Sequence, residues 1–286
     1  MTDADRSLAR LEAAYRSPLW QRPWRLAALG GPGFANAALT LGAGSLTAAM
    51  LSGANYGYQF LWVPVLAMGL ELFLLAGMAR LACRPGLNLI ETQNRRHGQW
   101  VGTLLTALVG CFAVALVFNY GQVVLALHLV EAAGHAWSLN VPQSLAGTGY
   151  TLFTASLVLA YQGGGRRARL IESFMKVAIA IMLLAFTVSL VLVGIDWGAA
   201  LRGLFLPSLP RGREGISLLL GTIGAAAGVM CWLFFVAAGR ERNWQPQHEP
   251  LARFDLFAGM FLPFVAINVI VICLFAGTLF GSGSTA

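Results

Sequence analysis

Charged side chains are scarce in this chain, which excludes most soluble folds. Only 11% of its 286 residues are charged, 57% are hydrophobic, and the mean hydropathy is +0.69. Soluble globular domains carry about 25% charged residues. The apolar segments have the length of membrane-crossing helices, about 20 residues each, and they lack the alternation of a membrane β-barrel. The sequence therefore predicts an all-α integral membrane protein.

Paired cysteines and a signal peptide are also missing. The four cysteines lie in or at the ends of apolar segments without CxxC spacing, so zinc and disulfide frameworks find no support, and we expect packing roles for Cys83, Cys111, Cys231 and Cys273. The first 25 residues carry eight charged side chains before any apolar run. Apolar residues recur there at helical spacing, so segment 1–25 is predicted to be a cytoplasmic amphipathic helix on the bilayer surface. A disordered tail is the alternative.

Seven apolar segments follow, and the arginines assign them a direction. The predicted spans are 27–50, 58–82, 100–130, 145–161, 170–194, 215–238 and 256–280. Fifteen arginines lie before span one or at the loops after spans two, four and six, against three in the opposite loops. This asymmetry favours a cytoplasmic N-terminus. The net charge of +7 is thereby explained by topology and acidic lipid, and nucleic acid is not an expected partner.

Two of the segments are interrupted by small residues at mid-membrane depth. The first run is Gly42–Ser45 and the second is Gly224–Gly228, and each is followed by a helix expected to carry a mid-helix proline, Pro64 or Pro263. Interrupted spans in corresponding halves of a membrane protein point to a transporter's substrate site. The interrupted spans are the first and the sixth, so the two copies must have opposite orientations, as in an inverted repeat.

The domain prediction follows from this count. Residues 1–286 form one membrane domain, in which 27–194 is a complete five-helix repeat and 215–286 a partial second one. Three further helices would complete it, so the chain is either a fragment, a shortened family member, or dependent on a partner membrane subunit. The stretch 195–214 is expected to be an external loop.

Ionisable groups within the spans are costly in hydrocarbon and are candidate functional residues. Glu71 is the clearest, either as a proton or cation site or as a structural partner of a neighbouring helix. Glu172 and Lys176 have the spacing of a local ion pair, and His128 and Glu131 are expected at the outer interface.

Neutral polar residues supply further candidates. Asn119 and Gln122 in span three and Asn268 in span seven are expected to hydrogen-bond across helices. Beside the breaks, the hydroxyl of Ser45 and the thioether of Met230 could each be a ligand or a packing group.

Several segments resemble the Nramp family of divalent-metal transporters. They are Gly31–Phe34, which reads GPGF, the Gly-rich break eight residues later, the stretch Tyr58–Trp62, and Gly224–Ala225 at the start of the second break. The resemblance covers most of the chain and implies a LeuT-like inverted-repeat fold. Counting without gaps, the family's arginine after span six falls on Arg242.

The resemblance is weaker where the family binds its metal. The family's Asp and Asn of span one fall on Gly42 and Ser45, its methionine on Gly228 with Met230 nearby, and its span-three acidic pair on Asn119 and Gln122. A divergent branch is therefore implied. A magnesium ion keeps several waters and needs fewer direct ligands.

The leading hypothesis is a secondary transporter for a divalent cation of the Mn, Fe or Mg class, working by alternating access in the bacterial inner membrane. Its expected partners are the lipid bilayer and the transported ion, with no resident cofactor. The coupling or gating candidates are Glu71, Asn119, Gln122 and Arg242, and the metal-ligand candidates are Ser45 and Met230. The expected substrate-binding residues are Gly42, Ala43, Gly44, Ser45, Ala225, Gly228 and Met230.

Alternatives from other classes remain. A degenerate, non-transporting homologue acting through a partner, or a transporter of a non-metal substrate, would also fit the lost ligands. A retinal receptor would need a lysine in its last span, whereas the only lysine is Lys176 in span five. An enzyme using Ser45 would need a positioned base, and none is apparent.

Overall fold

The computed structural model describes residues 3–84, 89–112, 142–162, 165–210, 212–226 and 228–280, with short pieces between 123 and 134. These residues form helices and no strands. The helices are α1 (Asp3–Tyr15), α2 (Arg22–Leu29), α3 (Pro32–Thr40), α4 (Ala43–Tyr56), α5 (Trp62–Ala82), α6 (Leu89–His97), α7 (Gln99–Phe112), α9 (Gln143–Gln162), α10 (Gly165–Val193), α11 (Trp197–Phe205), α12 (Arg213–Ala226), α13 (Val229–Glu241), α14 (Glu249–Asp255) and α15 (Leu262–Thr278). Shorter elements are the 3₁₀ turns η1 (Gly57–Phe60) and η3 (Pro246–His248) and the π-helix η4 (Leu256–Phe261).

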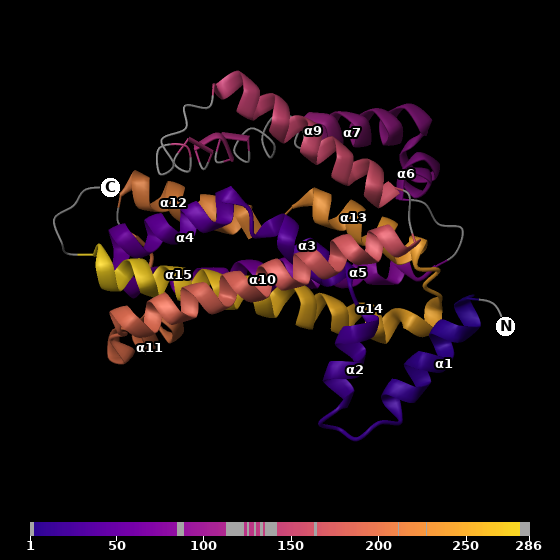
Figure 1. Ribbon diagram of the computed structural model, residues 1–286, viewed down its shortest axis with the longest axis horizontal. Coiled ribbons are helices and arrows are strands. Elements are labelled where there is room, and N and C mark those ends of the chain that lie inside the picture. The colour runs from indigo at the N-terminus through magenta and orange to yellow at the C-terminus, as the bar shows by residue number, and fades with distance from the viewer. Residues whose placement is uncertain are drawn as a thin grey trace. The chain divides into compact units, whose positions relative to one another are not determined.

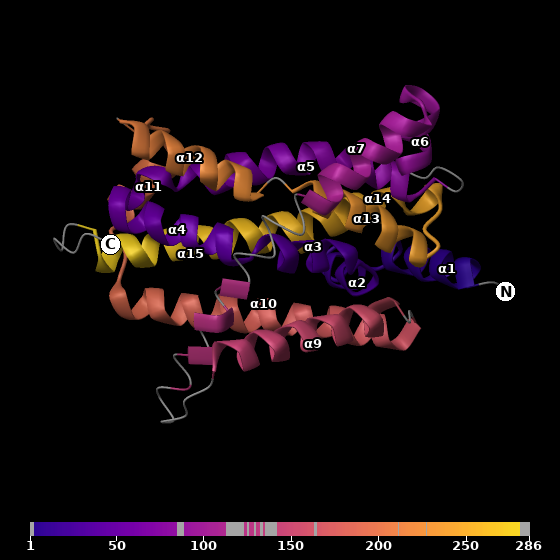
Figure 2. The same ribbon diagram turned by 90° about the horizontal axis from the view of Figure 1, so that it is seen from above.

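The chain divides into two compact units. Residues 1–86 and 175–286 form the first, and residues 87–174 form the second. The first unit holds both predicted breaks and the elements around them. In Figures 1 and 2, α4 lies along α15 within this unit, and these two helices are in extensive contact.

The second unit contains α6, α7, α9 and the first residues of α10. Helices α6 and α7 form a hairpin that turns at Gly98, whose φ of 87° suits glycine. The hairpin is fastened by a hydrogen bond of 3.0 Å from Asn94 Nδ2 to Thr103 Oγ1. Also in this unit, His128 Nδ1 lies 3.7 Å from Glu131 Oε2, and both side chains are exposed.

Four helical segments among the described residues are long and apolar enough to cross a membrane, or five when a bent pair counts as one span. They are Trp62–Ala82, Ser173–Val193, Arg213–Glu241 and Pro246–Thr278, and the bent pair is Pro32–Thr40 with Gly44–Phe60 at 55°. About seven spans were predicted, and the described residues contain four or five candidate spans. Part of 100–130 lies outside the described residues, and α9 covers 145–161 as a helix but is not among these candidates.

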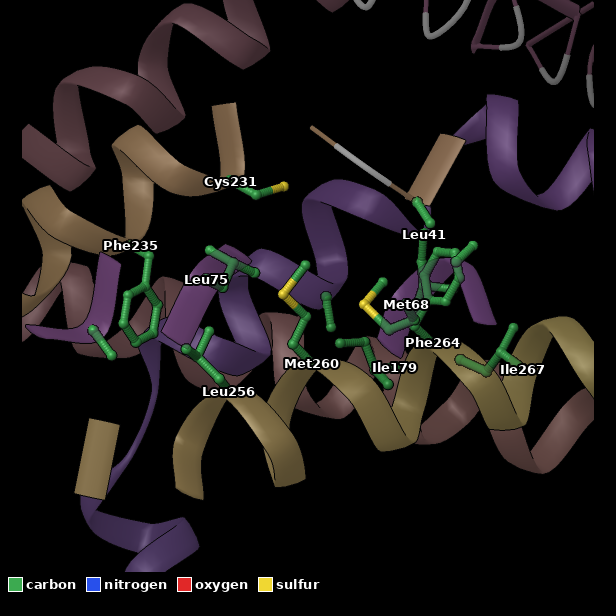
Figure 3. Packing of buried hydrophobic residues seen from close by; sticks show 14 of the residues in the cluster. Leu41, Met68, Leu75, Ile179, Cys231, Phe235, Leu256, Met260, Phe264 and Ile267 are labelled. Atoms are coloured by element: carbon green, nitrogen blue, oxygen red, sulfur yellow. The ribbon is translucent and has the colours of Figure 1, made fainter. Parts of the chain in front are cut away.

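Side chains from α5, α13, η4 and α15 form the core of the first unit. Figure 3 shows Met68 and Leu75 of α5 with Cys231 and Phe235 of α13 and residues of η4 and α15. The cysteines in this region are buried, as predicted for Cys83, Cys231 and Cys273. Burial and the nearby charge of Glu249 raise the pKa of the Cys83 thiol, at the end of α5, to about 11. The side chain of Cys111 lies outside the described part.

The N-terminal segment is helical, but its apolar face is used differently from the prediction. Leu11 and Ala14 of α1 are buried inside the protein, where α1 contacts α2 and η3. The side chains left exposed are Leu19, Trp20 and Trp24, each at least 74% exposed. The surface that suits a bilayer interface is therefore the turn between α1 and α2 and the start of α2.

Two further expectations are corrected by the helix boundaries, and one is confirmed. Pro64 lies in the first turn of α5 instead of its middle, and proline is tolerated there because the first turn has no backbone partner for its missing N–H. Pro263 is a mid-helix proline as predicted, because α14, η4 and α15 follow one another without interruption inside the helical segment Pro246–Thr278, and the wider turns of η4 directly precede it. The segment 195–214 contains the helix α11, whose N-cap is Asp196.

Candidate functional site

The first break lies at residues 41–42. Helix α3 ends at Thr40, Leu41 has a ψ of 42°, and Gly42 is extended. The predicted run Gly42–Ser45 is therefore displaced: Gly42 is in the break, whereas Ala43, Gly44 and Ser45 form the first turn of α4. The side chain of Ala43 lies outside the described part.

Hydroxyl groups satisfy the backbone at this break. Ser45 Oγ donates to the carbonyl of Thr40 at 2.7 Å and lies 3.2 Å from that of Gly42. Thr40 Oγ1 donates to the carbonyl of Asn36 at 2.7 Å. Ser45 is buried. Because its hydroxyl proton is donated to the backbone at the break, only the lone pairs of its oxygen could bind a ligand.

The second break lies between the end of α12 at Ala226 and the start of α13 at Val229. Within it, Gly228 is extended. Of the predicted run, Gly224 and Ala225 are in the last turns of α12, and Gly228 is the N-cap of α13. Residue 227 and the side chain of Met230 lie outside the described part.

The two broken spans pack against each other in opposite directions. Helix α3, before the first break, contacts α13, after the second, and α4 contacts α12. This pairing requires the two spans to run antiparallel with their breaks at the same level. Figures 1 and 2 both show α3 near α13 and α4 near α12.

Glu71 of α5 is almost fully buried beside the second break. Its Oε1 accepts a hydrogen bond of 2.7 Å from Trp232 Nε1, in the first turns of α13. The backbone N–H of Gly228 lies against the same carboxylate. The structure therefore places the predicted charged residue at the N-terminal end of a half-helix, where negative charge is favoured.

Asn36 is a buried polar residue that the sequence reasoning missed. It is fully buried in α3, and its Nδ2 donates to the carbonyl of Cys231 at 3.0 Å. An amide inside an otherwise apolar segment was the available signal. Asn36 and Glu71 are consequently held by neighbouring residues of one helical turn, Cys231 and Trp232.

A second carboxylate, Asp255, holds the start of α3. Its oxygens accept hydrogen bonds from the backbone N–H groups of Gly31 at 2.9 Å and Gly33 at 2.7 Å. The side chain is fully buried. Sequence reasoning missed this residue too, although an aspartate in an apolar run was the signal.

Two cations surround this contact. Arg242 Nη1 donates to the carbonyl of Leu29 at 3.2 Å, and Lys176 Nζ lies 3.4 Å from that of Gly30. Both are close enough to interact electrostatically with Asp255. Arg242, a predicted gating residue, thus lies at the N-terminal end of the first broken span.

Lys176 and Asn268 are further predicted residues that the structure places. Lys176 contacts Gly30 and the ring of Phe34, while the side chain of its predicted ion-pair partner Glu172 lies outside the described part. Asn268 donates to the carbonyl of Phe264 in its own helix at 2.8 Å, so the prediction of a bond across helices was wrong. Asn119 and Gln122 lie outside the described residues.

A metal centre built from the usual charged ligands is not formed by the described residues. Within this part of the chain, no group of three or more His, Cys, Asp and Glu side chains could hold a metal ion. Any cation here would therefore depend on one carboxylate with amide, hydroxyl and backbone oxygens, which suit hard divalent cations.

Comparisons with known proteins agree on one family. The family model described as natural resistance-associated macrophage protein-like, or Nramp, matches residues 33–286. The natural resistance-associated macrophage protein 2 of Mus musculus is 28% identical over 268 residues, which are 90% of this chain and 45% of that protein. The divalent metal cation transporter MntH of Mycobacterium tuberculosis is 27% identical over 271 residues, which are 90% of this chain and 59% of that protein.

Solved structures give the same result for the fold. A crystal structure of the Eremococcus coleocola manganese transporter has a TM-score of 0.70 at 22% identity, over 90% of this chain and 52% of that one. A mutant of the same transporter gives 0.74 at 20% identity, over 91% and 54%. The likeness confirms the all-α, LeuT-like fold. This chain spans about half the length of the relatives it matches.

Proposed function

Because this chain belongs to the Nramp family, we propose that it takes part in secondary transport of a divalent metal cation of the Mn, Fe or Mg class by alternating access. The observation that carries the proposal is the antiparallel contact of two broken spans, α3 with α13 and α4 with α12. Unwound backbone at membrane depth is tolerated only where it is buried in protein or lines a water-filled cavity.

The substrate class follows from charge and from the names of the relatives. The site region holds one buried carboxylate, Glu71, beside the second break, which favours a cation over an anion. The Mycobacterium protein is a divalent metal cation transporter and the Eremococcus protein a manganese transporter by name. Glu71 would compensate the charge of the ion, and the carbonyls and the Ser45 hydroxyl around Gly42 and Gly228 would contribute oxygen ligands.

Alternating access would use the half-helices as moving parts. The start of α3 is fastened to Asp255 and Arg242, so releasing these contacts would open one end of the path. In the proposed orientation, with the N-terminus in the cytoplasm, this end is the cytoplasmic one.

Uptake into proteoliposomes tests the function. The purified chain is reconstituted, and uptake of radioactive Mn²⁺ is measured alone and against excess Mg²⁺, with protein-free liposomes and Asn268→Leu as controls. We expect saturable uptake that Mg²⁺ reduces, together with a higher melting temperature in Mn²⁺. Absence of both metal-dependent flux and metal-induced stabilisation would overturn the proposal and favour a non-transporting homologue.

A further inference from the structure

Two buried oxygen atoms beside the second break have no hydrogen-bond partner among the described residues: Oε2 of Glu71 and Oδ1 of Asn36. Both side chains are at most 1% exposed. Leaving a buried acceptor unpaired is unfavourable because its lost hydration is not replaced, and more so for a charged group. Such atoms are rare in native proteins and mark a place where an ion or water completes the site.

The other polar atoms of these two side chains are fixed by one helical turn. Asn36 Nδ2 donates to the carbonyl of Cys231, and Glu71 Oε1 accepts from the indole of Trp232. The orientation of the Asn36 amide is therefore fixed: its nitrogen bonds to α13, and its oxygen makes no hydrogen bond among the described residues. The Gly228 N–H also faces the Glu71 carboxylate, and Oε2 of Glu71 is the oxygen without a hydrogen bond among the described residues. Helices α3 and α5 thus each place a polar side chain against adjacent residues of α13, Cys231 and Trp232.

We propose that Asn36 and Glu71 are direct oxygen ligands of the transported divalent cation, at the first turn of α13 next to the second break. This inference rests on the proposed transport function and names the ligands for it. A carboxylate oxygen and an amide oxygen are hard donors of the kind that Mg²⁺ and Mn²⁺ prefer. The ion would keep waters in its remaining positions, as the absence of a larger charged cluster in the described part requires.

Binding of Mn²⁺ to the purified full chain in detergent gives the first test. The loss of the free Mn²⁺ signal in electron paramagnetic resonance is titrated for the wild type, Glu71→Gln and Asn36→Leu. Since even outer partners of a metal site are worth about 10–100-fold in affinity, each variant should bind at least about tenfold more weakly. Mg²⁺ should compete with Mn²⁺ in the wild type.

Matched controls separate ligation from general damage. Asn268→Leu makes the same change at a buried helical asparagine whose amide bonds to its own helix, and Glu249→Gln removes a carboxylate that pairs with Arg80 and Arg253 away from α3 and α13. Both should keep the wild-type affinity. The melting temperature without metal and the gel-filtration profile report whether each variant is folded, and Glu71→Asp, which keeps the charge, replaces Glu71→Gln if that variant is not.

A double substitution tests whether Glu71 serves only to hold Trp232. In a Trp232→Phe background the indole donor is gone, so a structural role predicts that adding Glu71→Gln no longer changes the Mn²⁺ affinity. A ligand role predicts that the loss of about tenfold or more remains. Persistence of the loss supports the proposal, and its disappearance overturns it.

Uptake measured on the same variants keeps the two proposals apart. If the wild type binds and transports Mn²⁺ and both Glu71→Gln and Asn36→Leu do so with unchanged affinity, the ligand assignment is wrong and the transport function stands. If the wild type neither binds nor transports Mn²⁺ or Mg²⁺, the function itself is wrong and the ligand assignment falls with it.

Discussion

At the scale of single residues, the first break is held together by hydroxyl groups rather than by charged ones. The Ser45 hydroxyl donates a hydrogen bond to the carbonyl of Thr40, and the Thr40 hydroxyl donates one to the carbonyl of Asn36. The resemblance to the family places an Asp and an Asn at Gly42 and Ser45. The same two donor types, carboxylate and amide, occur in this chain at other positions: Glu71 in α5, and Asn36 in α3 of the same broken span.

The Ser45 hydroxyl is expected to stabilise the break. Ser45→Ala removes a donor from buried carbonyls that the break has freed, which should lower the free energy of unfolding by about 1–2 kcal/mol. Thermal unfolding in detergent measures this. Ser189→Ala is the control, because that hydroxyl bonds to Ala185 on the exposed face of a continuous helix. Equal shifts in the two variants would contradict a special role of Ser45.

At the scale of elements, the half-helix α3 is positioned by the π-helix η4 and the residue before it. Asp255 accepts the N–H groups of Gly31 and Gly33, which are among the donors that every helix start leaves without partners. Negative charge is favoured at this end of a helix. The wider turn of η4 begins directly after Asp255, and α3 packs along it.

Replacing Asp255 tests how firmly the start of α3 is held. Asp255→Asn can satisfy only one of the two N–H groups with an oxygen, so about 1–3 kcal/mol of stability should be lost. Hydrogen exchange of the peptide 29–36, followed by mass spectrometry, should speed up in the variant. Glu249→Gln is the control, because that carboxylate pairs with Arg80 and Arg253 in a partly exposed place, and it should leave the exchange unchanged. Equal acceleration in both variants would contradict the anchoring role.

The contact between α3 and η4 also depends on a residue without a side chain. A Cβ at Gly33 would overlap the backbone carbonyl of Asp255, whereas a Cβ at Gly44 in the first turn of α4 would meet nothing within 4 Å. Gly33→Ala should therefore destabilise by about 1–3 kcal/mol, and Gly44→Ala should be neutral or stabilising by about 0.5–1 kcal/mol. Melting temperatures of the two variants decide this, and a neutral Gly33→Ala would mean that α3 is not seated closely on η4.

At the scale of the whole molecule, local patterns predicted the elements better than the contacts between them. The runs of glycine and alanine located both breaks to within a few residues, because such runs weaken a helix locally. They could not show that Ala43–Ser45 would complete the first turn of α4. The position of Pro64 was misjudged for the same reason, since Pro64 starts a helix, whereas Pro263 lies inside the helical segment Pro246–Thr278 as predicted.

The long-range polar contacts could not be predicted from local sequence patterns. Asp255 meets Gly31 across 224 positions, and Asn36 meets Cys231 across 195, and no periodicity within a segment encodes such pairs. Glu71 was identified because a carboxylate within hydrocarbon is costly wherever it points. Its partner Trp232 followed only from the packing of α5 on α13. Single buried carboxylates are thus readable from sequence, and their partners are not.

The direction of the chain in the membrane is a property of the whole molecule that the charges predict. The arginine asymmetry favours a cytoplasmic N-terminus, and the antiparallel packing of the two broken spans then places the exposed stretch after α11 outside. Cysteines introduced by Glu12→Cys in α1 and by Ser208→Cys before α12 test this, since both native side chains are exposed. A membrane-impermeant maleimide should label the Ser208→Cys protein in intact cells and the Glu12→Cys protein only after permeabilisation. The reverse pattern would invert the molecule and assign the Asp255 and Arg242 contacts to the outer end of the path.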